Sequence, residues 1–275
     1  MAGRLFLVAT PIGNLGDLSP RAVEVLRAVQ LVACEDTRHS RVLFEAHGIS
    51  TPTWSLPAFS EGARAEGVIA RLQGGADVAL VTDAGSPGIS DPGERLVAEA
   101  VQAGIEVVPI PGPTALVAAL TGSGLPTGRF HFLGFLPRQA SEAREMLEEV
   151  AALSATLVLY ESPRRVAATL RLLAEVLGDR RACVARELTK LHEEFLRGSL
   201  AGLAGLLEAR EVLGEVVVVV EGRAAAARWA EEEVLGALRA GLARGERLKS
   251  LATDVARRAG WTGQAVYRLG LQLGR

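Results

Sequence analysis

Lysine is nearly absent from this chain of 275 residues. Among 30 basic residues only Lys190 and Lys249 are lysine, which leaves 28 arginines. The composition therefore lacks the joint lysine and glutamate enrichment of hyperthermophile proteins. Because arginine serves almost wherever the chain needs a cation, Lys190 stands out as a candidate for chemistry.

Groups that hold metals or form cross-links are also scarce. The two cysteines, Cys34 and Cys183, stand beside apolar residues and are expected to be small core residues in a reducing compartment. The four histidines are scattered along the chain without close ligand spacing, so we expect no metal site. They are His39, His47, His131 and His192.

Long apolar runs and nucleotide fingerprints are missing as well. No run of 18 apolar residues occurs, and the first apolar run, residues 5–9, is too short for a signal peptide. We therefore expect a cytoplasmic protein with no membrane partner. Neither GxGxxG nor GxxxxGK[ST] is present, which argues against a dinucleotide site or a P-loop. The net charge of −2 means that any basic surface for nucleic acid must be local.

What the chain does contain is a set of apolar strands that end in loops rich in glycine and proline. The central strand, Val78 to Val81, is apolar without a break, as in a strand covered on both faces, and leads into TDAGSPG. Asp83 stands at its carboxyl end, where ligands bind in open α/β sheets. Asp91 is expected to cap the next helix, with Pro92 at its first position. An ordinary turn between a strand and a capped helix remains the structural alternative.

The alternation of strands and helices predicts an α/β protein. About five alternations within residues 1–120 predict an N-terminal domain with a parallel sheet. A loop rich in glycine, serine and threonine opens a second α/β domain, residues 121–222, where fewer helices separate the strands and a mixed sheet is expected. In that domain Ser162 and Pro163 are expected to begin a helix. A helical tail fills residues 223–275.

The tail contains a pattern typical of a helix-turn-helix. Ala256 lies four residues before Gly260, and Val266 and Leu269 follow at helical spacing. Two packed helices with a glycine turn and no contact with nucleic acid remain the alternative.

Seven motifs follow one another in the order and spacing of a known family. They are TPIGNLGDLSPRA, CEDTRHS, TDAGSPGISDPG, PIPGPTAL, FLGFLPR, YESPRR and ARELTKLHEE. With these motifs the chain resembles bacterial small-subunit (16S) ribosomal RNA methyltransferases of the tetrapyrrole methylase group, class III of the S-adenosylmethionine-dependent methyltransferases. The resemblance covers residues 4–222 and the helical tail of longer members. Such enzymes methylate the ribose 2′-hydroxyl of a cytidine in the decoding region.

The resemblance implies two α/β domains with S-adenosyl-L-methionine between them, a homodimer, and small-subunit RNA in a 30S particle or late precursor as the partner. The positions that match cofactor-lining residues of the family are Pro11, Asp83, Ser86, Thr114, Ala115, Tyr160 and Leu188. One position departs from the pattern of tetrapyrrole-specific members, which carry a glycine before the acidic residue. This chain has Thr82 there, which favours the ribosomal branch.

The base that would take the proton of the ribose hydroxyl is not evident from the motifs. Lys190 and Glu187 are the catalytic candidates, and a surface or structural ion pair is an equally open interpretation of both. If Lys190 handles a proton, Lys190→Arg should slow methyl transfer at least ~10-fold. Arginines on loops at strand ends are candidates for clamping RNA phosphates. They are Arg38, Arg41, Arg164, Arg165 and Arg186.

Two other functions stay open at this point. One is a tetrapyrrole methyltransferase of the same fold, acting on a precorrin or a uroporphyrinogen. The other is a regulator that binds nucleic acid through its tail while the α/β part senses a nucleotide.

Overall fold

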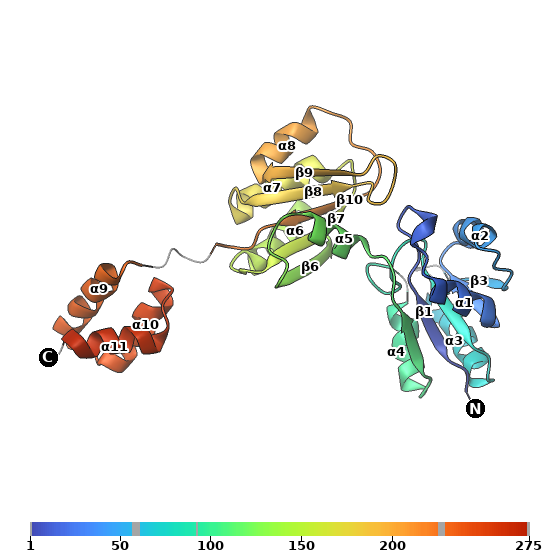
Figure 1. Cartoon of the computed structure of the whole chain (residues 1–275), viewed down its shortest axis with the longest axis horizontal. Helices are drawn as coiled ribbons and strands as arrows, with labels where there is room; N and C mark the ends of the chain where they lie inside the picture. The colour runs from blue at the N-terminus through green and yellow to red at the C-terminus, as the bar shows by residue number, and fades with distance from the viewer. Residues whose placement is uncertain (1, 57–60, 92, 225–228, 274–275) are drawn as a thin grey trace. The chain divides into compact units, whose positions relative to one another are not determined.

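The computed structural model describes residues 2–56, 61–91, 93–224 and 229–273. It divides into two compact units, one made of residues 1–151 and 155–221 and the other of residues 152–154 and 222–275. Figure 1 shows the order of their helices and strands. No helix of the described ranges is long and apolar enough to cross a membrane.

The first unit opens with a sheet of five parallel strands, which confirms the predicted parallel-sheet region. In the order of the sheet the strands are β3 (Thr53–Ser55), β2 (Leu31–Cys34), β4 (Val78–Val81), β1 (Leu5–Val8) and β5 (Val107–Ile110). The central strand β4 is buried at every residue, as its unbroken apolar sequence predicts. Both cysteines of the chain are buried and free, as expected.

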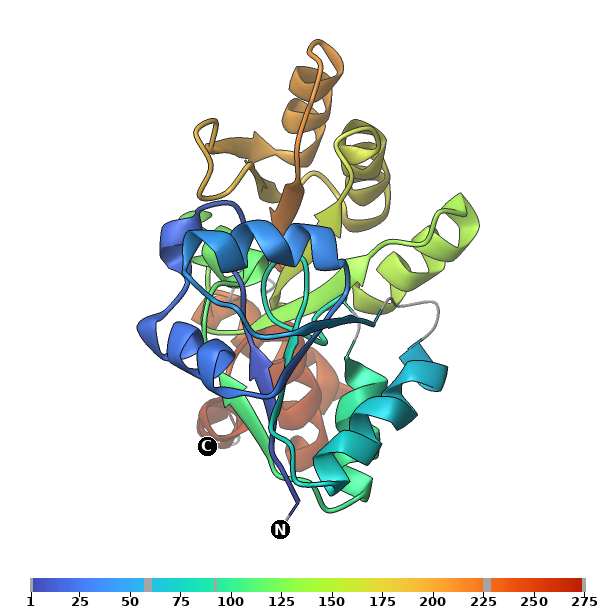
Figure 2. The same ribbon diagram turned by 90° about the vertical axis from the view of Figure 1, so that its right-hand side faces the viewer.

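Helices cover both faces of this sheet (Figure 2). Their bounds are α1 Pro20–Ala28, α2 Thr37–Ala46, α3 Glu61–Gln73 and α4 Glu94–Gln102. Leu26 of α1 and Phe44 of α2 join one apolar cluster with strand residues, whereas Leu72 of α3 and Leu96 of α4 join the cluster on the opposite face. Burial on both faces explains why these strands are nearly uniformly apolar.

The second sheet is mixed, as predicted. Its order is β6 (Phe130–Phe135), β7 (Thr156–Glu161), β10 (Val216–Val220), β8 (Arg181–Arg186) and β9 (Glu194–Ser199). Only β6 and β7 run parallel, and the other neighbours are antiparallel. Helix α5 (Ala115–Gly122) packs Leu116 and Leu120 on one face. The remaining helices of this unit are α6 (Ala140–Val150), α7 (Val166–Leu177) and α8 (Leu200–Glu208).

Two predicted helix starts are wrong. Helix α4 begins at Glu94 with Gly93 as its N-cap, so Asp91 does not cap it, and Pro92 lies outside the described residues. Helix α7 begins at Val166, with Arg165 as its N-cap, rather than at Pro163. The N–H groups of Arg165 and Val166 both donate to Ser162 O at 3.1 Å and close a turn before the helix.

Unit two contains three helices in its described residues, α9 (Glu231–Ala243), α10 (Leu248–Ala259) and α11 (Gly263–Leu273). Their core includes Leu238, Val255 and Val266, which confirms the predicted helical tail. Between α10 and α11, Gly260 has a φ of 67°, a left-handed conformation that suits glycine. The predicted domain boundary at residue 121 stays a prediction, and α5 continues through it to Gly122.

Candidate functional site

The site lies where two loops leave the parallel sheet in opposite directions. The chain leaves β1 toward β2 on one side of the sheet and leaves β4 toward β5 on the other, which creates a switch point between neighbouring strands. The two loops are joined there by paired backbone hydrogen bonds, Thr10 N–H to Gly85 O at 2.8 Å and Gly85 N–H to Thr10 O at 3.1 Å. The hydroxyl of Thr10 also donates to Thr82 O at 3.1 Å. Ligand sites of open α/β sheets form at such points.

A cavity of about 360 Å³ opens beside this junction. Its volume falls within the usual range of small-molecule sites, roughly 300–1,000 Å³. Apolar and aromatic side chains form much of its wall, with a few polar groups between them. The residues that line it include Ile12, Ser86, Asp91, Thr114, Ala115, Phe135, Tyr160 and Leu188. We call this space the apolar cavity.

The wall of the apolar cavity is held by contacts among the loops after β4 and β5, helix α5 and strand β7. The hydroxyl of Ser86 donates to Pro113 O at 3.4 Å, which ties the loop after β4 to the loop after β5. The hydroxyl of Tyr160 accepts the N–H of Leu116 at 3.3 Å, at the first turn of α5. The ring of Tyr160 meets the edge of Phe135 with centroids 5.6 Å apart. A rigid wall of this kind can orient a planar ligand group.

Asp91 places a carboxyl group in the apolar cavity. Burial is the main cause that raises its pKa from 3.8 to about 6, and the negative charges of Glu35 and Asp83 add to the effect. Such a group exchanges its proton within the physiological range of pH. The sequence pattern assigned Asp91 to a helix cap instead, a role that the structure gives to Gly93.

A second cavity of about 370 Å³ adjoins the first and shares Ile12, Ala84 and Glu215 with it. Charged and polar side chains mark this space, among them His39, Asp83 and Lys190. Pro11 also lines it, so two of the seven predicted cofactor residues, Pro11 and Asp83, border this space rather than the apolar cavity. We call it the charged cavity.

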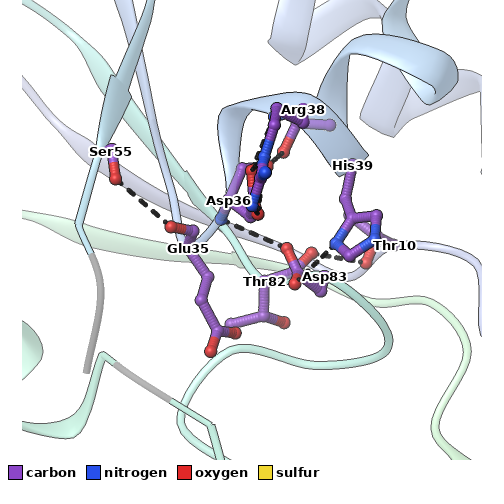
Figure 3. Close-up of polar contacts among 9 residues, drawn as sticks. Thr10, Glu35, Asp36, Arg38, His39, Ser55, Thr82 and Asp83 are labelled. Atoms are coloured by element: carbon purple, nitrogen blue, oxygen red, sulfur yellow. Dashed lines mark hydrogen bonds and ion pairs between the residues drawn. The ribbon is translucent and has the colours of Figure 1, made fainter. Parts of the chain in front are cut away.

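Asp83 is the centre of a polar cluster at the edge of the charged cavity (Figure 3). Its Oδ2 lies 3.0 Å from His39 Nδ1, and its Oδ1 accepts the N–H of Asp36 at 3.2 Å. Asp36 caps α2 by accepting the N–H of Arg38 at 2.8 Å. The Arg38 side chain pairs with Asp36 at 2.6 Å and holds the pKa of that carboxyl low, at about 2. The loop after β4 and the start of α2 are therefore linked through one carboxylate.

Lys190 and Glu187, the predicted catalytic residues, are paired with each other. Lys190 Nζ donates to Glu187 Oε1 at 2.9 Å and to Glu215 Oε2 at 3.2 Å. Partial burial alone would lower the pKa of Lys190, but its hydrogen bonds to both carboxylates outweigh burial and raise it. The hydrogen bond from Lys190 is the main cause that lowers the pKa of Glu187. Both groups therefore stay charged at neutral pH.

The loop that carries Lys190 has an unusual backbone. Glu187 and Thr189 have φ values of 51° and 66°, a region that costs non-glycine residues free energy and is enriched at functional sites. The carboxylate of Glu187 fills the space beside Gly214, where a Cβ atom would lie 2.0 Å from its Oε1. Across from it, a Cβ on Gly13 would lie 2.5 Å from Lys190 Cγ. These close approaches fix the position of the Lys190 side chain.

The five arginines predicted to bind RNA fall into two groups. Arg38, Arg41 and Arg164 are exposed. Arg165 donates to Pro137 O at 3.0 Å, and Arg186 donates to Glu194 at 3.2 Å and to Leu213 O at 3.2 Å. The contacts of the second group are structural, because they hold loops of the second sheet.

Sequence reasoning missed His39, Glu215 and the role of Asp91 in the cavity wall. The sequence places His39 among scattered histidines and in the motif CEDTRHS, but gives it no role of its own. Its partner Asp83 lies 44 residues away, and only the adjacency of β2 and β4 in the sheet brings the two together. The order of strands was not part of the prediction, so this pair could not be found.

Comparison with known proteins places the chain in a family. The family model described as tetrapyrrole (corrin/porphyrin) methylases matches residues 4–204. The chain belongs to this family. It is 44% identical over 274 residues to the ribosomal RNA small subunit methyltransferase I of Synechocystis sp., covering 98% of both chains. It is 47% identical to the protein of the same name from Mesorhizobium japonicum, covering 98% of this chain and 92% of that one.

Solved structures extend the likeness of the fold. Uroporphyrin-III C-methyl transferase from Thermus thermophilus, in complex with S-adenyl homocysteine, superposes with a TM-score of 0.59 at 20% sequence identity, covering 80% of this chain and 97% of that one. The predicted tetrapyrrole methylase-like fold is therefore confirmed. Membership of the family also confirms the predicted methyltransferase class and its cofactor, S-adenosylmethionine.

The residues present fit that cofactor. The apolar cavity offers aromatic and aliphatic surface for a purine ring and a carboxyl group for a cation or a diol. The hydroxyls of Thr82 and Thr189 are buried and, within the described residues, have no hydrogen-bond partner. Neither residue lines the apolar or the charged cavity, so these hydroxyls do not bear on the fit of the cofactor.

Proposed function

We propose that this chain transfers a methyl group from S-adenosylmethionine to the ribose 2′-hydroxyl of a cytidine in the decoding region of small-subunit (16S) ribosomal RNA. The observation that carries the proposal is the 44% identity to a ribosomal RNA small subunit methyltransferase across 98% of both chains. Likeness to the tetrapyrrole enzyme, at 20% identity, concerns the fold alone and gives no support to a tetrapyrrole substrate.

The apolar cavity is the proposed cofactor site. Ser86, Thr114, Ala115, Tyr160 and Leu188 line it, as five of the seven predicted cofactor residues. When bound, the cofactor supplies an electrophilic methyl group. The aromatic and aliphatic wall excludes water from that group, and the ties from Ser86 and Tyr160 keep the wall in place.

The charged cavity is the proposed entrance for the RNA ribose. It adjoins the apolar cavity through Ile12, Ala84 and Glu215, so a hydroxyl held there would lie next to the cofactor site. Among the predicted phosphate ligands, Arg38, Arg41 and Arg164 are exposed and remain proposed contacts. Arg165 and Arg186 support this surface indirectly by holding loops of the second sheet.

We assign Lys190 an electrostatic role in place of proton transfer. A pKa held above its usual value keeps the ammonium charged, and a charged ammonium cannot accept a proton. Glu187 fixes Lys190 at 2.9 Å and also accepts the N–H of Glu215 at 3.1 Å. The pair therefore holds an ammonium at the charged cavity, where it can stabilise the developing charge on one oxygen. Its two carboxylate partners leave no net positive charge to attract a phosphate.

The proposal also covers the assembly state of the substrate, the oligomeric state of the enzyme and its location in the cell. The family resemblance supports a 30S particle or a late precursor as the substrate, a homodimer as the enzyme, and the cytoplasm as the location. The low net charge of −2 gives little non-specific attraction to free RNA. Light scattering coupled to size-exclusion chromatography measures the mass of the assembly and would contradict the dimer by showing one chain.

The experiment that tests the function compares three substrates under the same conditions. Cofactor with a labelled methyl group is incubated with the purified chain and small subunits lacking the modification, protein-free 16S RNA, or uroporphyrinogen under anaerobic conditions. We expect label in the subunits, less in naked RNA and none in the tetrapyrrole. Label in uroporphyrinogen alone would overturn the proposal, and faster labelling of naked RNA would overturn the preference for the assembled subunit.

A further inference from the structure

The pair of His39 and Asp83 offers a group that can accept a proton, which Lys190 and Glu187 do not offer. Asp83 is held on both oxygens, by the Asp36 N–H on Oδ1 and by the His39 ring on Oδ2 (Figure 3). Because a carboxylate accepts the Nδ1–H of the imidazole, this contact fixes the tautomer that leaves Nε2 as an acceptor. The His39 side chain is 71% exposed and lines the charged cavity, so Nε2 remains accessible to a substrate.

The charges around His39 come from several elements. The hydrogen bond to Asp83 is the main cause that raises its pKa, with the charge of Asp36 adding and that of Arg38 opposing. The start of α2 also opposes a positive ring, because a helix N-terminus carries partial positive charge. Lys190 and Glu215 lie across the same cavity.

The other candidates for a base are poorer. Lys190 is held as an ammonium by two carboxylates, and the pKa of Glu187 is lowered by Lys190. Asp91 lines the apolar cavity, away from the space that His39 and Lys190 share.

We propose that His39 accepts the proton of the ribose 2′-hydroxyl at Nε2, with Asp83 as its positioning residue. This inference rests on the proposed function. The hydroxyl oxygen forms its bond to the methyl carbon as the O–H bond breaks and the proton passes to Nε2. The carbon–sulfur bond of the methyl donor breaks with its electron pair remaining on sulfur. Proton, methyl group and electrons are then balanced without any further reactant.

The test is single-turnover methyl transfer to small subunits at saturating cofactor, measured across pH. We expect His39→Gln to slow transfer by ~100-fold or more, the range of general base catalysis. Asp83→Asn should slow transfer and move the rising limb of the pH–rate profile to lower pH, because the group that raises the pKa of His39 is removed. His39→Ala should recover part of its rate with added imidazole. His131→Gln, an exposed histidine on β6, is the control with an unchanged rate.

A purely structural role of His39 at the start of α2 makes a different prediction. His39→Gln would then lower the melting temperature but keep the rate and its pH profile, and this result would overturn the inference. Affinities for cofactor and RNA should change less than ~3-fold in His39→Gln, since a proton acceptor acts in the transition state. A wild-type chain that methylates no RNA would overturn the proposed function itself, and would be recognised before any variant is made.

A second inference comes from an independent observation, the distribution of charge along the chain. Residues 222–275 hold ten of the 30 basic residues and five of the 32 acidic ones, a net charge of +5. Residues 1–221 therefore carry −7. Arg247, the N-cap of α10, and Lys249 and Arg257 on α10 border a shallow groove with Ser250 and Thr253. Asp254 in this groove pairs with Arg257 at 2.5 Å, so its charge is neutralised locally.

The unit that carries this groove has a core of its own. Trp261 Nε1–H donates to Trp229 O at 2.8 Å, and Val255 and Val266 are fully buried. Helices α10 and α11 share one core and are joined by a short turn at Gly260, and the helix-turn-helix stays a prediction. The major groove of duplex RNA is too deep and narrow for a helix, so contacts of such a unit with RNA would go to phosphates. We infer that the α10 groove binds the phosphate backbone of folded ribosomal RNA, again resting on the proposed function.

Binding of the full chain to small-subunit RNA at a series of salt concentrations tests this inference. We expect the double change Arg247→Gln with Lys249→Gln to weaken binding and to reduce the salt dependence by roughly two counterions. The rate at saturating RNA should stay unchanged. Arg239→Gln on α9, also exposed, is the control and should change little. Equal affinity and salt dependence in the double variant would overturn the inference. So would tighter binding to duplex DNA than to RNA, while methylation of subunits would still support the proposed function.

Discussion

The two adjoining cavities have similar volumes but differ in the side chains that line them. The apolar cavity, about 360 Å³, has a wall of Ile12, Phe135, Tyr160 and Leu188, whereas the charged cavity, about 370 Å³, is bordered by His39, Asp83 and Lys190. An apolar space strengthens electrostatic interactions and excludes water, whereas a space lined by both acidic and basic groups suits polar groups such as a ribose hydroxyl. This difference supports the proposal that the cofactor binds in one cavity and that the ribose binds and loses its proton in the other.

The largest expected effect comes from filling the apolar cavity. Ala115→Trp places a ring in the space of the proposed cofactor, and we expect at least ~100-fold weaker binding of S-adenosylmethionine by calorimetry, equivalent to about 2.7 kcal/mol. Binding of RNA should persist, because the charged cavity is left intact. Val117→Trp is the matched control, since Val117 lies on the same helix with its side chain 45% exposed. Unchanged cofactor affinity in Ala115→Trp would mean that the apolar cavity is not the cofactor site.

A medium effect on the rate of methyl transfer is expected from removing the charge of Lys190. Lys190→Met should slow single-turnover transfer by ~10-fold, about 1.4 kcal/mol in the barrier, while cofactor affinity stays near wild type. Lys190→Arg keeps the charge and should lose less than ~3-fold. This expectation replaces the slow Arg variant predicted from the sequence, because the raised pKa of Lys190 argues against proton transfer. A Lys190→Arg variant as slow as Lys190→Met would restore the proton-handling role.

The smallest expected effect concerns the carboxyl group in the apolar cavity. Burial raises the pKa of Asp91 to about 6, so the folded chain holds this proton more tightly than the unfolded chain does. The free energy of unfolding should therefore fall as pH rises from about 4 to about 6 and stay lower above that. Asp91 is partly exposed, so we expect Asp91→Asn to stabilise the ligand-free chain by on the order of 1 kcal/mol at pH 8.

Denaturant unfolding of wild type and Asp91→Asn at pH 4 and pH 8 checks this expectation. The difference between the two proteins should shrink toward zero at pH 4, where both carry a neutral group. A stabilisation of equal size at both pH values would mean that desolvation of the charge is not its cause.

The sequence predicted the strands and loops that form the site better than the contacts between its side chains. Strands such as β10 were found because five consecutive valines have high strand propensity and few competing structures. The predicted helix starts were wrong where tertiary contacts outweighed the local capping signals. At Ser162 the buried carboxylate of Glu161 accepts the Ser162 N–H at 2.7 Å and the Thr169 hydroxyl at 2.6 Å, and the chain turns before α7 begins.

The chemistry of single residues was harder to predict because it depends on partners far away in the sequence. Lys190 was singled out by composition, but its two carboxylates, Glu187 and Glu215, decide its charge. A chemical role for His39 follows only from its contact with Asp83, which lies in the loop after the neighbouring strand β4. Family motifs located the loops of the site, and the order of strands in the sheets determined which side chains meet.

Nucleoside mass spectrometry of 16S RNA, after a single turnover on small subunits with labelled cofactor, tests the proposed ribose methylation directly. We expect one labelled cytidine in the decoding region, with the methyl group on its ribose. Filling the apolar cavity by Ala115→Trp should abolish that label, and His39→Gln should only delay it. The proposed ribose methylation would be contradicted by a methyl group on a base, by label on many nucleotides, or by no label in the RNA.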